Sequence, residues 1–122
     1  MARHPEITRS SFGEITVGKK TYEHDVYIRA DGEVKKRKKS IAKAAYGTGH
    51  MIGPGELKKV CKGAPEVVFV GLGQSGLAEL TREGQQFLRA RGIALCALPT
   101  PQAVEAYNES RQRKAALIHV TC

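Results

Sequence analysis

Three short apolar runs in the second half of the chain, separated by segments with helical spacing, constrain the fold more than any other feature. The runs cover residues 66–70, 93–98 and 115–120. The first is rich in β-branched residues, which is typical of a strand buried on both faces, and we interpret the second as another buried strand and the third as a further apolar strand. Strands that alternate with helices pair in parallel through right-handed crossovers. The sequence therefore predicts an α/β fold with three parallel strands.

Start signals between the runs indicate three helices. Pro54 suits the first position of the first helix. Thr81 can cap a second helix, which ends at Gly92. Thr100 is expected to cap a third helix, with Pro101 at its first position.

The N-terminal part of the chain indicates strands joined by turns. Apolar residues alternate with polar ones at residues 15–17, and residues 22–28 place four side chains on one face. The Asp-Gly pair at residues 31–32 favours a hairpin, and residues 33–39 are then expected to form an edge strand. Two glycines favour a loop over residues 40–50. Together with the helices, these elements predict three layers: a mostly parallel mixed central sheet, flanking helices and an N-terminal antiparallel β-hairpin region.

The chain has 122 residues, of which 41% are hydrophobic, so it can bury one core and is too short for two domains. We expect a single domain over residues 1–122. No apolar run approaches the roughly 20 residues of a membrane span, and no signal-peptide pattern is present, so a cytoplasmic location is expected. The chain has three cysteines, Cys61, Cys96 and Cys122. Their odd number argues against a disulfide framework, and their spacing argues against a zinc site.

Basic residues are concentrated in the first half of the chain. The formal net charge is +8, and residues 1–62 hold 14 of the 20 basic residues but 7 of the 12 acidic ones. Most of the excess is one run, Lys35-Lys36-Arg37-Lys38-Lys39. Such a run attracts phosphates or acidic partners, or is a solvated segment that keeps a sheet edge from pairing. Because no aromatic residue is interleaved, nucleic-acid binding through this run is the less favoured hypothesis.

Ligands of parallel sheets bind beyond the carboxyl ends of the strands. Three segments are expected to converge there: residues 71–76, 99–101 and 121–122. The glycines let backbone N–H groups point outward and the third helix presents its N-terminus, so this edge favours an anion or a carboxylate. The predicted ligand-binding residues are Gly71, Gly73, Gln74, Ser75, Gly76, Thr100, His50 and Cys122.

The glycine spacing in residues 71–76 matches the dinucleotide-binding fingerprint, but the rest of that pattern is missing. Residues 77–80 separate the motif from the helix cap at Thr81, whereas the helix of the fingerprint begins within the motif. Pro99 stands near the place of the acidic residue that holds the ribose. No Lys-Ser/Thr pair follows, so the loop is not a P-loop either. We therefore expect no cofactor.

His50 supports an alternative, enzymatic hypothesis. An imidazole titrates near neutral pH, so His50 could serve as acid or base for a nucleophile, Ser75 or Cys122, in a small hydrolase or transferase. The simpler interpretation of His50 is a loop residue that bonds the backbone. This alternative stays open.

Neither loop holds an obvious carboxylate. Asp25 and Asp31 belong to the hairpin region, and Glu56 is a first-turn helix residue favoured by the helix dipole. A hydrolase with paired carboxylates therefore has no support. His24 and His119 fall within strand patterns and are expected to be satisfied structural residues.

Five stretches, in this order, resemble the Mth-domain family of unknown function. They are residues 21–26 (TYEHDV), 47–50 (GTGH), 71–76 (GLGQSG), 98–101 (LPTP) with Tyr107 and Asn108, and 119–122 (HVTC). The resemblance covers nearly the whole chain and implies a three-layer α/β domain with a mixed central sheet. It implies no catalytic residues, because the family has none established. It does imply a protein partner in assembly or regulation, while the lack of a mitochondrial presequence means that the role of relatives in respiratory complex I assembly is not implied.

The leading hypothesis is a non-enzymatic binding or protein-interaction domain with a small polar pocket at the glycine loops, which takes an anion or a carboxylate.

Overall fold

The computed structural model describes residues 4–121 of the chain. In chain order its elements are β1 (Ile7–Ser11), β2 (Glu14–Val17), β3 (Lys20–Tyr22), β4 (Val26–Ile28), β5 (Val34–Lys36), α1 (Lys39–Tyr46), β6 (Met51–Ile52), α2 (Pro54–Val60), β7 (Val67–Leu72), β8 (Glu79–Leu80), α3 (Arg82–Ala90), β9 (Ala94–Leu98), α4 (Thr100–Glu109) and β10 (Lys114–His119). Within the described part of the chain, no helix has the length and apolar character needed to cross a membrane.

The central sheet is mixed and has five strands in the order β5-β4-β10-β7-β9. Its strands β10, β7 and β9 run parallel, as their alternation with helices predicts. Strands β4 and β5 extend the sheet in antiparallel fashion on the other side of β10. A separate antiparallel sheet contains β1, β2 and β3, and a short parallel pair joins β6 to β8.

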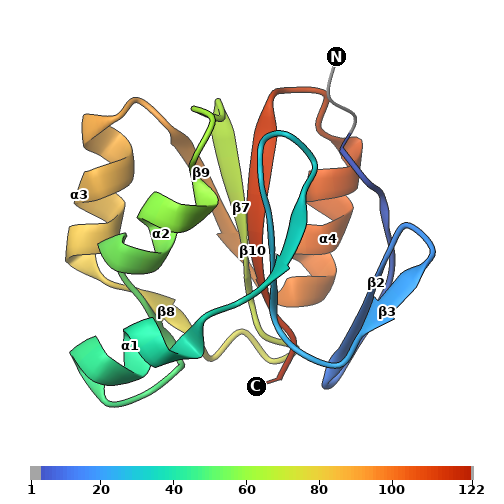
Figure 1. Cartoon of the computed structure of the whole chain (residues 1–122), viewed down its shortest axis with the longest axis horizontal. Helices are drawn as coiled ribbons and strands as arrows, with labels where there is room; N and C mark the ends of the chain where they lie inside the picture. The colour runs from blue at the N-terminus through green and yellow to red at the C-terminus, as the bar shows by residue number, and fades with distance from the viewer. Residues whose placement is uncertain (1–3, 122) are drawn as a thin grey trace.

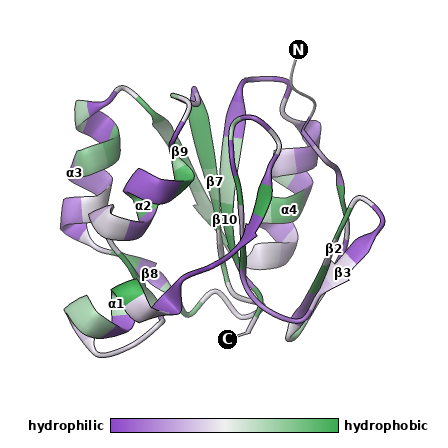
Figure 2. Cartoon of the chain, in the orientation of Figure 1, coloured by the Kyte–Doolittle hydropathy of each residue, from purple (hydrophilic) through white to green (hydrophobic). Residues whose placement is uncertain are grey.

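The molecule has three layers, which confirms the predicted architecture. Helices α1, α2 and α3 cover one face of the central sheet, while α4 and the β1–β3 sheet cover the other (Figure 1). Each face has its own apolar cluster. Val68 and Val70 of β7 pack with α2 and α3, whereas Val67 and Phe69 pack with α4 and the small sheet. Apolar residues therefore concentrate on the central strands (Figure 2).

Strand β9 differs from the prediction of a strand buried on both faces. It is an edge strand of the central sheet, and its first two residues, Ala94 and Leu95, are exposed. Its apolar residues are only partly covered, because Cys96 packs against the α4 side and Ala97 against the side of α2 and α3, and both clusters leave the strand half-buried. A run of apolar residues does not distinguish an edge strand from a central one, because both carry apolar side chains on a covered face.

The predicted strand over residues 22–28 is broken in two. β3 ends at Tyr22 and β4 begins at Val26, because the chain crosses here from the small sheet to the central sheet. All three residues of β4 are buried. Asp25, the last residue of the crossing, is 2% exposed.

The predicted loop over residues 40–50 is wrong for most of its length, because helix α1 occupies Lys39–Tyr46. Ala42 is buried on its inner side, and Gly47 ends the helix in a left-handed conformation at φ 75°. Gly47 therefore marks a helix end, where a residue without a Cβ takes positive φ without strain.

Other local predictions are confirmed. The hairpin at residues 31–32 joins β4 to β5, an edge strand that is shorter than predicted. Pro54 begins α2, and the Thr81 hydroxyl accepts a hydrogen bond from the Gly84 N–H at the start of α3.

Candidate functional site at the carboxyl edge of the central sheet

The carboxyl ends of the three parallel strands meet at one edge of the central sheet, which is the expected arrangement. Gly71 of β7 pairs with Leu98 of β9 on one side and with Ile118 of β10 on the other. Beyond the strands, the Gln74 N–H donates a hydrogen bond to the carbonyl oxygen of Thr121 (2.7 Å). The loop after β7 and the segment after β10 therefore lie side by side.

Thr100 joins these segments, but not as the predicted helix cap. Its side chain makes no capping hydrogen bond in α4. The Oγ1 atom instead donates to the carbonyl oxygen of His119 (2.5 Å) and accepts from the Gly73 N–H (3.0 Å). A Cβ at Gly71 would lie 2.7 Å from Oγ1, so glycine permits this close approach. The correction has a tertiary cause, because the Thr100 hydroxyl faces the ends of β7 and β10, where both of its hydrogen-bond partners lie.

The loop over residues 71–76 uses most of its backbone donors within the protein. The N–H groups of Gly73, Gln74 and Gly76 all donate to protein oxygens. Ser75 is exposed. The side-chain Nε2 of Gln74 is buried and has no hydrogen-bond partner among the described residues. Anion binding at this loop stays a prediction, and fewer amides are available for it than the glycine pattern indicates.

His50 lies at the same edge. It precedes β6, and its ring packs edge-to-face on the ring of His119, with centroids 5.3 Å apart. Cys122 lies outside the described residues. The hypothesis that His50 activates Ser75 or Cys122 therefore stays a prediction.

A buried ionic network, absent from the predicted site, lies beneath this edge. The Arg37 guanidinium donates from Nε and Nη2 to both carboxylate oxygens of Glu56 (2.7 and 2.8 Å), and from Nη1 to Asp25 (2.9 Å). The Tyr27 hydroxyl adds a hydrogen bond to Glu56 (2.6 Å). The side chains of Arg37, Asp25 and Glu56 are all 0–1% exposed. Buried charges require such pairing, because an unpaired charge in the interior is very costly.

Asp25 stays ionised in this environment. Burial alone would raise the pKa of its carboxyl group, but hydrogen bonds from His119 and the Val120 N–H, together with Arg37, hold that pKa well below its usual range. Burial would likewise lower the pKa of Arg37, whereas Glu56 and Asp25 raise it above the ordinary value. Asp25 and Arg37 therefore both carry their charges in the folded protein.

His119 extends the network toward the surface. Its Nδ1 lies 2.7 Å from Asp25 Oδ2, and its Nε2 lies 3.1 Å from the Thr121 hydroxyl. An ionised carboxylate only accepts, so Nδ1 carries the proton and, in the neutral ring, Nε2 accepts from Thr121. His119 is fully buried with satisfied nitrogens, as its strand pattern predicts. In the described part of the chain, no cluster of His, Cys, Asp or Glu could hold a metal ion.

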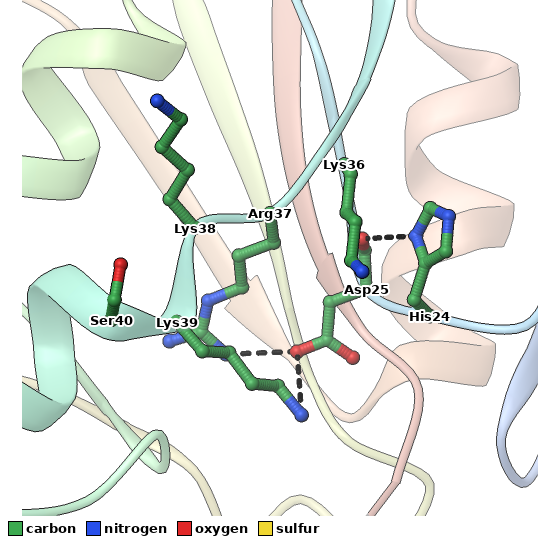
Figure 3. Close-up of a pocket in the computed structure, with 7 residues that line it drawn as sticks. All are labelled: His24, Asp25, Lys36, Arg37, Lys38, Lys39 and Ser40. Carbon is green, nitrogen blue, oxygen red and sulfur yellow. Dashed lines mark hydrogen bonds and ion pairs between the residues drawn. The ribbon is translucent and has the colours of Figure 1, made fainter.

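A hollow of about 440 Å³ opens beside Asp25 (Figure 3). The residues that line it come from two segments, His24 with Asp25 and the run from Lys36 to Ser40. Lys39 Nζ lies 3.6 Å from Asp25 Oδ2, while the Lys38 side chain points away from that carboxylate (Figure 3). We call this cavity the basic hollow, since its lining carries four cationic side chains and one carboxylate.

The basic run is thus divided by the fold. Lys35, Lys36 and Lys38 are exposed, which agrees with a solvated edge, but Arg37 points inward and is 3% exposed. The amino-acid types in this run do not indicate that Arg37 is buried while its neighbours are exposed. The only sequence signal for the network was indirect, because the stretches behind the family resemblance contain Asp25 and His119.

Residues 7–119 match a family described as "Protein of unknown function (DUF498/DUF598)". The chain belongs to this family. The match spans nearly all of the domain, and it confirms the resemblance to Mth-domain proteins together with the structural neighbours below. No curated protein matches this member of the DUF498/DUF598 family.

Solved structures of similar proteins share the whole fold. PH1505, a conserved hypothetical protein of Pyrococcus horikoshii, is 31% identical, with a TM-score of 0.89 over 96% of this chain and 99% of the other. The protein MT938 is 32% identical, with a TM-score of 0.84 over 97% of this chain and 99% of the other. A Bordetella pertussis protein described as an Mth938-like domain is 18% identical, with a TM-score of 0.67 over 94% of this chain and 85% of the other, and shows a shared fold alone.

Proposed function

We propose that this DUF498/DUF598 protein is a binding module that holds a carboxylate-bearing, acidic segment of a protein partner in the basic hollow. The observation that carries the proposal is the placement of Lys36, Lys38 and Lys39 around a cavity of about 440 Å³. A volume of this size accommodates one or two side chains or a small anion.

The charge balance of the basic hollow favours an anionic ligand. Arg37 carries one positive charge against the two carboxylates of Glu56 and Asp25, so the network has one negative charge in excess, and three lysines lie around the hollow beside it. Lys36 and Lys38 therefore leave an excess of positive charge at the opening, to which Lys39 adds while it also contacts Asp25. Positive charge in a concave surface attracts acidic partners and speeds their association.

A protein partner is favoured over a nucleic acid for this hollow. Sequence-tolerant nucleic-acid sites stack bases on aromatic side chains that are interspersed with basic residues. The lining of the hollow contains His24 but no Phe, Tyr or Trp. Carboxylates need only cations and hydrogen-bond donors, which lysines supply.

The proposal is tested by NMR titration with a short polyglutamate peptide, with acetate, inorganic phosphate and a mixed oligonucleotide as further arms. We expect the amides of residues 36–40 to shift with the peptide, and Lys39→Gln to weaken that binding severalfold. Lys19→Gln, which removes the same charge from an exposed turn, is the matched control and should bind like the unchanged protein.

Three outcomes would overturn the proposal. Stronger binding of the oligonucleotide than of the peptide would favour the nucleic-acid hypothesis. Shifts confined to Gly73–Gly76 and Thr100 would favour the anion pocket predicted at the glycine loop. Equal loss of affinity in Lys39→Gln and Lys19→Gln would show attraction by net charge without a site.

A further inference from the structure

Three side chains form a line from the interior to the carboxyl edge. Asp25 Oδ2 lies 2.7 Å from His119 Nδ1, and His119 Nε2 lies 3.1 Å from Thr121 Oγ1. They come from the crossing before β4, the end of β10 and the segment after it. His119 is fully buried, while Thr121 is half-buried and reaches the surface.

The hydrogen bonds around these three side chains determine which atom donates and which accepts in each contact. Arg37 and the Val120 N–H occupy the Asp25 oxygens together with His119, so Asp25 is held in place as a carboxylate. The carboxylate fixes the proton of His119 on Nδ1, which leaves Nε2 as the basic nitrogen that faces the Thr121 hydroxyl. A hydroxyl, a histidine base and a carboxylate that orients the base are the arrangement of an activated oxygen nucleophile.

The backbone of Gln74 lies beside the segment that carries Thr121, and its side chain holds an unpaired donor. Its backbone N–H is bonded to the carbonyl oxygen of Thr121 at 2.7 Å. Its side-chain Nε2 is buried and has no partner among the described residues. A buried donor without an acceptor costs free energy, so a ligand oxygen is expected to complete it.

We propose that Thr121 is an acyl-accepting nucleophile, with His119 as its general base, Asp25 as a positioning residue and Gln74 as a donor to the substrate carbonyl oxygen. The substrate class is a carboxylic ester with a good leaving group. This activity goes beyond the binding function above and does not require it. It also differs from the hypothesis that pairs His50 with Ser75 or Cys122, because His119 is the base.

The reaction balances with water as the only co-reactant. Thr121 Oγ forms a bond to the ester carbonyl carbon while its proton passes to His119 Nε2. The tetrahedral intermediate then expels the alkoxide, which takes that proton and leaves as the alcohol. Water attacks the resulting threonine ester, transfers a proton to His119, and the released Thr121 oxygen takes the proton back. The products are a carboxylic acid and an alcohol.

The test uses p-nitrophenyl acetate with the full chain carrying Cys122→Ala, so that a thioester at residue 122 cannot form. Acetylated protein is measured by mass spectrometry before and after alkaline hydroxylamine, which removes an acetyl ester from threonine but leaves acetyl-lysine intact. We expect one hydroxylamine-labile acetyl group, mapped to the peptide that contains Thr121.

Variants separate the proposal from background acetylation. Thr121→Val keeps the shape and should abolish the labile acetyl group, whereas Thr121→Ser should retain it. Gln74→Ala should slow labelling about tenfold or more, while Gln85→Ala, at an exposed position, should not. His119→Gln should slow it by about a hundredfold or more, and the two Thr121 variants decide the question if that protein does not fold.

A labile acetyl group at another residue, no labile group, or unchanged labelling in Thr121→Val would each overturn the inference. Binding of the polyglutamate peptide should be the same in Thr121→Val as in the unchanged chain, so the failure of one proposal is distinguishable from the failure of the other.

Discussion

At Asp25, one carboxylate oxygen faces Arg37, His119 and Lys39, while the other accepts a backbone N–H. The residue has no regular secondary structure, yet it connects the end of β10 to the start of α1. A single buried carboxylate thus holds three segments that are distant in sequence, and its ionisation affects the stability of the whole domain.

Asp25 predicts acid sensitivity. Its folded pKa is lowered from the ordinary value of 3.8, so its stabilisation is fully present above about pH 4 and is lost as pH falls further, because the unfolded state then binds a proton more readily. We expect the free energy of unfolding to fall more steeply with acid in the unchanged protein than in Asp25→Asn. Urea unfolding between about pH 6 and pH 3 measures this difference, and parallel profiles would contradict it.

The Arg37–Glu56 pair predicts strongly coupled substitutions. Removal of one partner from a buried ion pair leaves an uncompensated charge and costs about 3–5 kcal/mol. We expect Arg37→Met and Glu56→Leu each to destabilise by about this amount, and the double variant to lose less than their sum. A double-mutant cycle from urea unfolding measures the coupling, and additive effects would show that the pair is not a unit.

At the scale of elements, tertiary packing determines that residues 39–46 form a helix and that strand β9 lies at the edge of the central sheet. Helix α1 forms although its eight residues include two lysines and no acidic residue in the first turn. Short helices have marginal intrinsic stability, so burial of its inner side against α2 and β6 provides the support. The edge position of strand β9 also depends on the tertiary structure, because the apolar sequence of a strand does not indicate whether another strand pairs with its outer side.

The junction of β7 with α4 predicts a glycine requirement. Gly71→Ala would place a methyl group 2.7 Å from Thr100 Oγ1 and 3.4 Å from Ile118. We expect a loss of about 1–3 kcal/mol, the usual cost of overpacking. The same substitution should cost less in a Thr100→Ala background, where the clash is absent. Thermal unfolding of the four proteins measures this, and equal costs in both backgrounds would contradict it.

At the scale of the whole molecule, two apolar clusters on opposite faces of the central sheet are joined through its strands. A domain of this size unfolds cooperatively, so buried groups become accessible mainly through opening of a large part of the structure. The cysteines report this behaviour, because Cys61 is buried while Cys96 is half-buried.

We therefore expect the rate of modification to follow global unfolding at Cys61 but not at Cys96. Burial raises the pKa of the Cys61 thiol to about 11, so little thiolate is present at pH 8. In a Cys122→Ala chain, iodoacetamide should modify Cys61 slowly in the native protein and much faster with urea, in parallel with the unfolded fraction. Cys96 should depend less on urea. Equal native rates at the two cysteines would contradict the prediction.

Local signals in the sequence determined the alternation of strands and helices, the hairpin at residues 31–32, the starts of α2 and α3, and hence the parallel strands whose ends meet at one edge. Periodicity and capping depend on residues close together in the chain, and this is why they are readable without the structure. The same signals placed Gly71 and Thr100 together, although the role of the Thr100 hydroxyl depends on strand ends elsewhere.

Only the tertiary structure decided which charged residues are buried. Asp25, Arg37, Glu56 and His119 lie far apart in the sequence, and each has an ordinary local interpretation as a turn, surface, helix-dipole or core residue. A charged side chain enters the interior only where partners from other elements neutralise it and satisfy its hydrogen bonds. Those partners are brought together by the packing of β4, β10 and α2, so the line that ends at Thr121 could not be derived from any one stretch of sequence.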